Sequence, residues 1–208
     1  MTVSRQAGSR VMTKMGSEND RSLVARLRAG DVAAFDRVYD DYRPRVFGFL
    51  LRMSRSRTLA EDLLDETWLR LVRHAPALTP DTNIGAWLFT VARNLYWSHR
   101  RASLVEEASA PELIGLWPSS MTWPSPFDLA VADELERRVE AALSVLPPQY
   151  REAVLLVAHE GLTPGEAAHV CGIRPEAFRQ RLSRARAALA ATIDLPGAMP
   201  DAKRRYGT

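Results

Sequence analysis

The chain has 208 residues, of which 46% are hydrophobic and 25% charged. This length fits one large domain or two small ones, and this composition excludes a disordered or fibrous protein. No run of about 18 apolar residues occurs, so we expect no membrane insertion, and the first twenty residues lack the apolar core of a secretory peptide. The only cysteine, Cys171, can form no internal disulfide and suits a reducing cytoplasm.

Helical periodicity dominates the first half of the chain. Residues 1–20 are polar and aperiodic, and we expect them to form a disordered leader. Four helices are expected over 21–102: the first ends at Gly30, the second follows the cap Asp31, the third runs from the cap Thr58 to His74, and the fourth covers about 84–101. The sequence therefore predicts one small helical domain over 21–102.

Prolines and carboxylates set the middle of the chain apart. Residues 103–130 contain four prolines, which interrupt any helical period. Residues 102–136 carry seven carboxylates and no lysine or arginine, a net charge of −7. The sequence predicts an acidic, flexible linker over 103–130.

A second helical domain is predicted over 131–195, followed by a flexible tail over 196–208. Helices are expected at about 129–146, 149–160, 163–171 and 175–192. Thr163 and Glu166 have the spacing of a capping box, and Gly172 ends that helix before Pro175 starts the next. A short helix, a glycine turn and a second helix are typical of a helix-turn-helix. The fold class predicted is all-α, with two small helical domains joined by a linker.

The last predicted helix has one apolar face and one basic face. Phe178, Leu182, Ala185 and Leu189 recur every three or four residues and should pack in the core. Residues 174–186 contain five arginines against one glutamate, and arginine suits phosphate and guanine. A solvated helix surface is the alternative. We expect this face to contact duplex DNA through Arg174, Glu176, Arg179, Gln180, Arg181, Ser183, Arg184 and Arg186.

The third predicted helix carries an apolar residue on its acidic side. Its buried face should be Ala60, Leu63, Leu64, Thr67 and Leu71. The opposite face would then hold Asp62, Asp65, Glu66, Leu69 and Arg73. A leucine surrounded by carboxylates suits a basic helix of a partner protein.

The fourth predicted helix combines arginines with aromatic side chains and has no carboxylate over 87–102. Trp87, Val91, Ala92 and Leu95 can face the core, while another sector holds Thr90, Arg93, Asn94, Trp97, Arg100 and Arg101. Rings that stack on bases beside guanidinium groups that hold phosphates suit single-stranded nucleic acid. The preceding loop, with Asp81, Thr82 and Asn83, could form a pocket for an unstacked base. The alternative is that Trp97 packs in the core.

These segments resemble a known family. The segments AEDLLDETWLRLVRHA (60–75) and WLFTVARNLYWSHRRA (87–102) resemble region 2 of bacterial RNA polymerase sigma factors, and residues 146–189 resemble region 4. Because no large domain lies between them, the chain looks like the extracytoplasmic-function (ECF, group IV) class.

The resemblance implies a transcription initiation factor. The acidic face of the third helix would dock on the clamp of core RNA polymerase. The fourth helix and the loop before it would hold the melted non-template strand of the −10 element, and the last helix would read the duplex −35 element. An anti-sigma factor is implied as a further partner, and the location would be the cytoplasm, at the nucleoid or sequestered at the inner membrane face.

Three other functions compete with this one. A sigma mimic that titrates an anti-sigma factor usually lacks a competent DNA face or carries a regulatory domain, and neither description fits this chain. A helix-turn-helix regulator that binds duplex DNA without polymerase would explain the last helices, but not the arginine- and tryptophan-bearing fourth helix. An enzyme has little support, because no glycine-rich phosphate loop occurs and His159, His169 and Cys171 lack a fourth ligand for zinc. We expect no catalytic residues, no metal and no cofactor.

Overall fold

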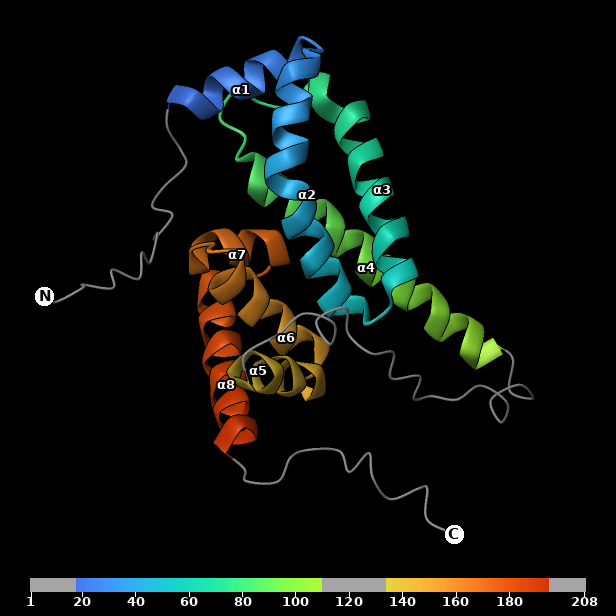
Figure 1. Ribbon diagram of the computed structural model, residues 1–208, viewed down its shortest axis with the longest axis vertical. Helices are drawn as coiled ribbons and strands as arrows, with labels where there is room; N and C mark the ends of the chain where they lie inside the picture. Colours follow the sequence, from blue (N-terminus) through green and yellow to red (C-terminus); the bar gives the residue numbers. More distant parts are fainter. Residues whose placement is uncertain (1–17, 110–133, 195–208) are drawn as a thin grey trace, which may run out of the picture.

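The computed structural model describes residues 18–109 and 134–194, which form two groups of helices (Figure 1). The N-terminal lobe contains α1 (Glu18–Arg28), α2 (Val32–Ser54), α3 (Arg57–His74), a short 3₁₀ turn and α4 (Ile84–Ser109). The C-terminal lobe contains α5 (Glu134–Val145), α6 (Pro148–Val154), a π-helical turn, α7 (Pro164–Cys171) and α8 (Pro175–Asp194). No strand occurs among these residues, in agreement with the all-α prediction. The expected leader, most of the expected linker and the expected tail lie outside the described residues.

The boundaries of the N-terminal helices follow local capping. Asp31 caps α2 as predicted, since its Oδ1 accepts hydrogen bonds from the backbone N–H groups of Ala33 at 2.9 Å and Ala34 at 3.2 Å. The prediction that Thr58 caps α3 is wrong. Ser56 is the cap, with an extended backbone and its Oγ accepting from the Leu59 N–H at 3.3 Å, and Thr58 already lies inside the helix.

Helix α4 is longer than predicted. It continues past residue 101 to Ser109, so the first residues of the expected linker are helical. The segment before Pro111 holds alanines, a leucine and two glutamates, which favour helix. The proline therefore acts on residues close to it rather than on the whole segment.

The N-terminal core forms where α2, α3 and α4 meet. Phe49 of α2 and Phe89 of α4 are fully buried and pack edge to face, with ring centroids 5.6 Å apart. The predicted buried face of α3 is confirmed, and Trp68 extends it. Its ring lies 4.8 Å from that of Tyr39, between centroids. This packing fixes which side of α3 faces solvent.

The helix-turn-helix of the C-terminal lobe is formed as predicted. Thr163 and Glu166 complete a capping box at the start of α7, and Gly172 ends the helix with a φ of +65°. Phe178, Leu182 and Ala185 of α8 are buried, which confirms the apolar face, and Leu189 packs against them partly buried. These contacts leave the polar face of α8 on the outside.

The expected single helix over 149–160 is only partly α-helical. Helix α6 gives way to a π-helical turn at Leu155–His159, closed by a hydrogen bond from the Glu160 N–H to the Leu155 carbonyl at 2.9 Å. A π turn accommodates one extra residue and rotates whatever follows it. Glu160 is buried there, and its carboxylate contacts Arg45 of α2 in the other lobe.

The two lobes pack directly on one another. Helix α4 lies against α7, and α2 lies against α6. The buried apolar side chains of both lobes form one continuous cluster. Figure 1 shows α5–α8 next to the lower part of α2 and the first half of α4, while the last turns of α4 run away from them. The structure thus adds an interface between lobes to the two domains predicted from sequence.

Candidate nucleic-acid and partner interfaces

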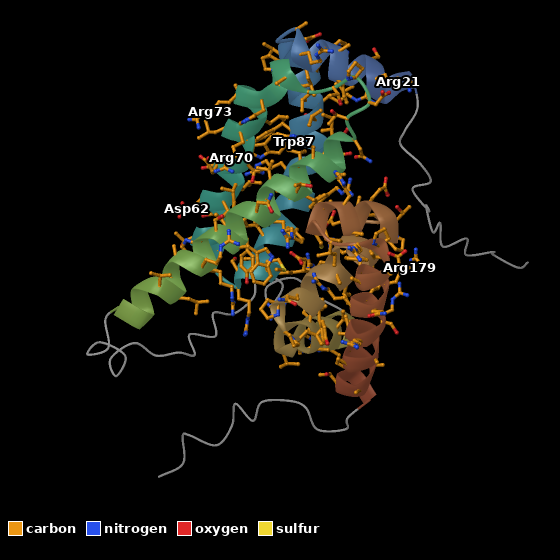
Figure 2. The ribbon with its side chains drawn as sticks, turned by 180° about the vertical axis from the view of Figure 1, so that it is seen from behind. Arg21, Asp62, Arg70, Arg73, Trp87 and Arg179 are labelled. Atoms are coloured by element: carbon orange, nitrogen blue, oxygen red, sulfur yellow. The ribbon has the colours of Figure 1, made fainter. Side chains whose placement is uncertain are left out.

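The outer face of α3 presents apolar side chains among charges. Asp62, Asp65 and Arg73 are exposed, and Leu69 keeps 49% of its surface accessible. Glu66 is half-buried and pairs with Arg70 at 2.9 Å between Nε and Oε1. In Figure 2, Asp62, Arg70 and Arg73 project on the side away from the C-terminal lobe. We call Asp62, Asp65, Glu66, Leu69, Val72 and Arg73 the α3 face.

Val72 was missed in the sequence analysis although it belongs to this face. It is 57% exposed and lies one helical turn after Leu69. The spacing of three residues was visible in the sequence. Together the two side chains make an apolar contact point in a charged surface.

The loop before α4 is held by its own polar groups and by contacts with α1 and α7. Asp81 pairs with Arg21 of α1 at 2.8 Å, with both side chains well exposed. The Thr82 hydroxyl accepts a hydrogen bond from the Thr79 N–H at 3.0 Å. Asn83 caps α4 by accepting from the Ala86 N–H at 2.9 Å, and its amide donates to Glu166 of α7 at 3.2 Å. The loop is thus shaped by α1, α4 and the C-terminal lobe.

The polar sector predicted for α4 is divided by the lobe interface. Asn94, Arg100 and Arg101 are exposed, and Thr90 bonds to the Ala86 carbonyl of its own helix at 2.7 Å. Arg93 and Trp97 are instead covered by the C-terminal lobe, and the Arg93 side chain keeps 19% of its surface. Neither the core position weighed for Trp97 nor a freely exposed one describes this arrangement.

A buried glutamate of α6 holds these two side chains. Glu152 has a side-chain exposure of 0%, and its Oε1 accepts from Arg93 Nε at 2.8 Å and from Trp97 Nε1 at 2.7 Å. Its Oε2 lies 3.5 Å from Nη1 of Arg181 on α8. We call Glu152, Arg93, Trp97 and Arg181 the interlock. Sequence analysis assigned no role to Glu152, because nothing local marks a carboxylate that is paired across 59 residues of chain.

Cys171 lies beside the interlock as a buried, unreactive thiol. Its Sγ is 3.5 Å from Oε2 of Glu152. Burial, and then the charge of Glu152, raises the pKa of the thiol to about 12. At neutral pH the group is therefore protonated and acts as a small core side chain.

The outward face of α8 holds most of the residues predicted for duplex DNA. Arg181 is the exception, since it turns toward Glu152 and keeps 20% of its side-chain surface. Arg179 lies 3.4 Å from Glu176 on the same helix and points outward in Figure 2. The exposed members are Arg174, Glu176, Arg179, Gln180, Ser183, Arg184 and Arg186. Such a face offers both base-edge donors and phosphate contacts.

A cationic cavity opens between α4 and α8 next to the interlock. Its volume is about 280 Å³. It is lined by Arg93, Asn94, Trp97, Arg101, Gln149 and Arg181.

Among residues 18–109 and 134–194, no group of three histidine, cysteine or acidic side chains could hold a metal ion, and no helix is long and apolar enough to cross a membrane.

Comparison with known proteins identifies the family. Residues 38–103 match the model of sigma-70 region 2, and residues 136–189 match that of sigma-70 region 4. The chain belongs to the sigma-70 family. It is 36% identical over 161 residues to the RNA polymerase sigma factor CarQ of Myxococcus xanthus, covering 77% of this chain and 90% of CarQ. It is 34% identical over 157 residues to the ECF RNA polymerase sigma factor EcfG of Rhodopseudomonas palustris, covering 74% of this chain and 82% of that one.

The fold agrees with solved sigma factors. The sigma factor RpoE of Bartonella quintana, solved in complex with the anti-sigma factor NepR, superposes with a TM-score of 0.65 at 25% identity, covering 79% of this chain and 99% of that one. The protein is therefore an alternative sigma factor of the ECF class, a subunit that directs core RNA polymerase to promoters. These matches do not favour a duplex-binding regulator that works without polymerase.

Proposed function

We propose that three surfaces of this sigma factor have separate roles in transcription initiation. The α3 face docks on core RNA polymerase, the α4 sector with the preceding loop holds the melted −10 strand, and the outer face of α8 reads the −35 duplex. The supporting observation is that the α3 face and the α8 face are exposed on opposite sides of the molecule (Figure 2). One protein can therefore contact polymerase and duplex DNA at the same time.

Docking through the α3 face rests on its pairing of apolar and acidic groups. Leu69 and Val72 offer apolar area, and Asp62 and Asp65 flank them with negative charge. A basic helix, such as the clamp helices of the polymerase largest subunit implied by the resemblance, satisfies both features. Reversing the charge of Asp62 and Glu66 should weaken binding to core polymerase. Charge reversal at Asp36, an exposed carboxylate on α2, is the control. Equal affinity of the parent, the control and the Asp62 and Glu66 variant for core polymerase would contradict this docking surface.

Reading of the −35 element rests on the second helix of the helix-turn-helix. Gln180 and Arg184 lie one turn apart on its exposed face, where amide and guanidinium groups can bond to base edges in the major groove. Gln180→Ala and Arg184→Ala should each reduce discrimination at one promoter position by about 1–3 kcal/mol. Arg186→Ala should weaken binding at all sequences alike, as loss of a phosphate contact does. Unchanged promoter preference in the first two variants would refute the assignment.

Binding of the −10 strand is assigned to the α4 sector. Trp97 can stack on a base and Arg93 can hold a phosphate once both leave Glu152. Trp97→Ala should then impair promoter opening by the holoenzyme more than it impairs duplex binding. Permanganate reactivity of the melted region measures opening. Footprints equal to those of the parent would contradict a role of Trp97 in binding the −10 strand.

The remaining expectations are also proposed. We infer that an anti-sigma factor binds this chain, as one binds the Bartonella quintana relative, and that the protein works in the cytoplasm, at the nucleoid or sequestered at the inner membrane face. It is proposed to have no catalytic activity of its own, since polymerase supplies the chemistry. Purification of the tagged full chain from its host, with identification of the copurifying proteins, tests the first two points together.

A further inference from the structure

The cavity between α4 and α8 is built from both lobes and is open to solvent. Four of its lining residues belong to α4, while Gln149 belongs to α6 and Arg181 to α8. Asn94, Arg101 and Gln149 are exposed, so a small molecule can enter from solvent. The volume of about 280 Å³ lies at the lower end of the range of about 300–1,000 Å³ that small-ligand sites occupy. The cavity therefore suits a molecule about the size of a mononucleotide.

The charge of the lining matches one phosphate group. Three arginines line the cavity, and one buried carboxylate, Glu152, contacts Arg93 at 2.8 Å and Arg181 at 3.5 Å. Arg101 donates to a neutral group, the Ser98 hydroxyl, at 3.2 Å. Three positive charges against one negative charge leave a net charge of +2. A phosphate monoester carries a charge of about −1.5 to −2 at neutral pH, so a single phosphate would neutralise the site.

The lining also has hydrogen-bond donors that the protein does not use. Arg93 donates from Nε to Glu152 and from Nη1 to Oδ1 of Asn94 at 3.0 Å, which leaves its Nη2 without a hydrogen bond among the described residues. Arg181 donates only from Nη1, at the long distance of 3.5 Å. Because Asn94 accepts through its oxygen, its amide nitrogen remains available to donate. Guanidinium and amide donors on one side of a cavity suit phosphate oxygens.

Trp97 gives the cavity an aromatic wall with a fixed orientation. Its Nε1–H donates to Glu152 at 2.7 Å, and its ring packs edge to face on Tyr96 with centroids 5.3 Å apart. An indole held in place beside guanidinium groups suits a nucleobase, which stacks on the ring while the arginines hold its phosphate. The Gln149 amide, from the other lobe, offers a donor and an acceptor for the base or the ribose.

We propose that this cavity is a binding site for a nucleoside monophosphate, with the phosphate between Arg101 and Arg181 and the base stacked on Trp97. The ligand is a small metabolite rather than promoter DNA, so the inference goes beyond the proposed function and does not depend on the −10 assignment. A bound nucleotide contacts both lobes at once. Because only the folded protein has this site, the nucleotide should stabilise the fold in proportion to its concentration above the dissociation constant.

The test uses the full-length protein, freed of nucleic acid, with AMP and GMP as probes. Isothermal titration calorimetry should give a dissociation constant below about 1 mM, and the melting temperature should rise with nucleotide concentration. Adenosine and guanosine lack the phosphate and should bind at least about tenfold more weakly, since they lose the charged hydrogen bonds. Inorganic phosphate lacks the base and should also bind at least about tenfold more weakly than AMP.

Two exposed positions, one in each lobe, provide the variants. Arg101→Gln should weaken AMP binding about tenfold, and Gln149→Ala should weaken it about threefold. Arg100→Gln is the matched control for the first, because Arg100 is the adjacent exposed arginine, has the Tyr96 hydroxyl as its partner and does not line the cavity. It should bind AMP as the parent does. Gln149→Ala removes no charge, so it also carries the test if Arg101→Gln fails to fold.

The outcomes separate this inference from the proposed function. A dissociation constant above about 1 mM for both AMP and GMP would overturn the inference, as would parent-like binding in both Arg101→Gln and Gln149→Ala. Phosphate that binds as tightly as AMP would show an anion site without base recognition and would also overturn it. Failure of the −10 assignment is read separately, from the permanganate footprint of Trp97→Ala in holoenzyme without added nucleoside monophosphate.

Discussion

Arg151 is expected to be among the most destabilising positions to truncate. Its side chain is buried and donates to five backbone carbonyls: Leu143, Ser144 and Leu146 at the end of α5 and the turn after it, and Arg52 and Met53 near the end of α2, at 2.8–3.4 Å. These carbonyls lie where helices run out of their own donors, so one guanidinium caps two helices from different lobes. Burial lowers the pKa of Arg151 from its usual value, which records the hydration that the guanidinium gives up.

The magnitude follows from the carbonyls that Arg151→Ala would strand. Each buried polar group left without a partner costs about 1–3 kcal/mol. The alanine variant also avoids the cost of taking the guanidinium out of water on folding, which offsets part of this sum. We expect Arg151→Ala to reduce the free energy of unfolding by about 3–5 kcal/mol, close to the loss on breaking a buried charged contact. For a chain of this size the melting temperature should fall by roughly 6–20 °C.

Thermal unfolding of the full chain, followed by circular dichroism, measures this loss. Arg151→Lys keeps the charge but has only three donors, so it should fall between the parent and the alanine variant. Arg57→Ala removes an arginine whose ion pair is exposed and should shift stability by less than about 0.5 kcal/mol. A melting temperature of Arg151→Ala within about 2 °C of the parent would refute the reasoning.

Three smaller perturbations test local features by the same melting assay. Thr163→Ala removes half of the α7 capping box and should cost about 1 kcal/mol; no loss would mean that water replaces the cap. Gly172→Ala should cost about 1 kcal/mol through its positive φ, since a Cβ there meets no atom within 4 Å; a neutral result would contradict backbone strain. The contact with Arg26, followed by backbone N–H groups, lowers the pKa of Asp31. This carboxylate therefore stabilises the fold above its unfolded pKa of about 4 and loses that effect as the pH falls further. Asp31→Asn should make the melting temperature fall less steeply between neutral and acidic pH. An unchanged slope would show that Asp31 is not the source of the acid sensitivity.

Local patterns in the sequence predicted the helices well. The apolar period of α8 and the capping box of α7 depend on residues within a few positions of one another, and both are present as expected. The error at α3 has the same local scale, since Ser56 and Thr58 are both competent caps and only the backbone conformation at Ser56 decides between them. The π turn at Leu155–His159 has no comparable local signal in the sequence.

Contacts between the lobes could not be predicted in this way. Arg151 and Glu152 look like ordinary surface residues of an amphipathic helix, and both are buried because α2 and α4 lie over them. Arg93 and Trp97 were both predicted to lie in the polar sector of the fourth helix, but their common partner, Glu152, is 55–59 residues away in the chain. Pairing over such separations depends on tertiary packing, which periodicity does not record.

The most direct test of the whole account is run-off transcription by core RNA polymerase with the purified full chain on a library of random genomic fragments. The account predicts discrete start sites that core polymerase alone does not use, preceded by shared −10 and −35 elements, with Gln180→Ala and Arg184→Ala changing only the −35 preference. Initiation indistinguishable from that of core polymerase alone, with no binding of the chain to the enzyme, would contradict it.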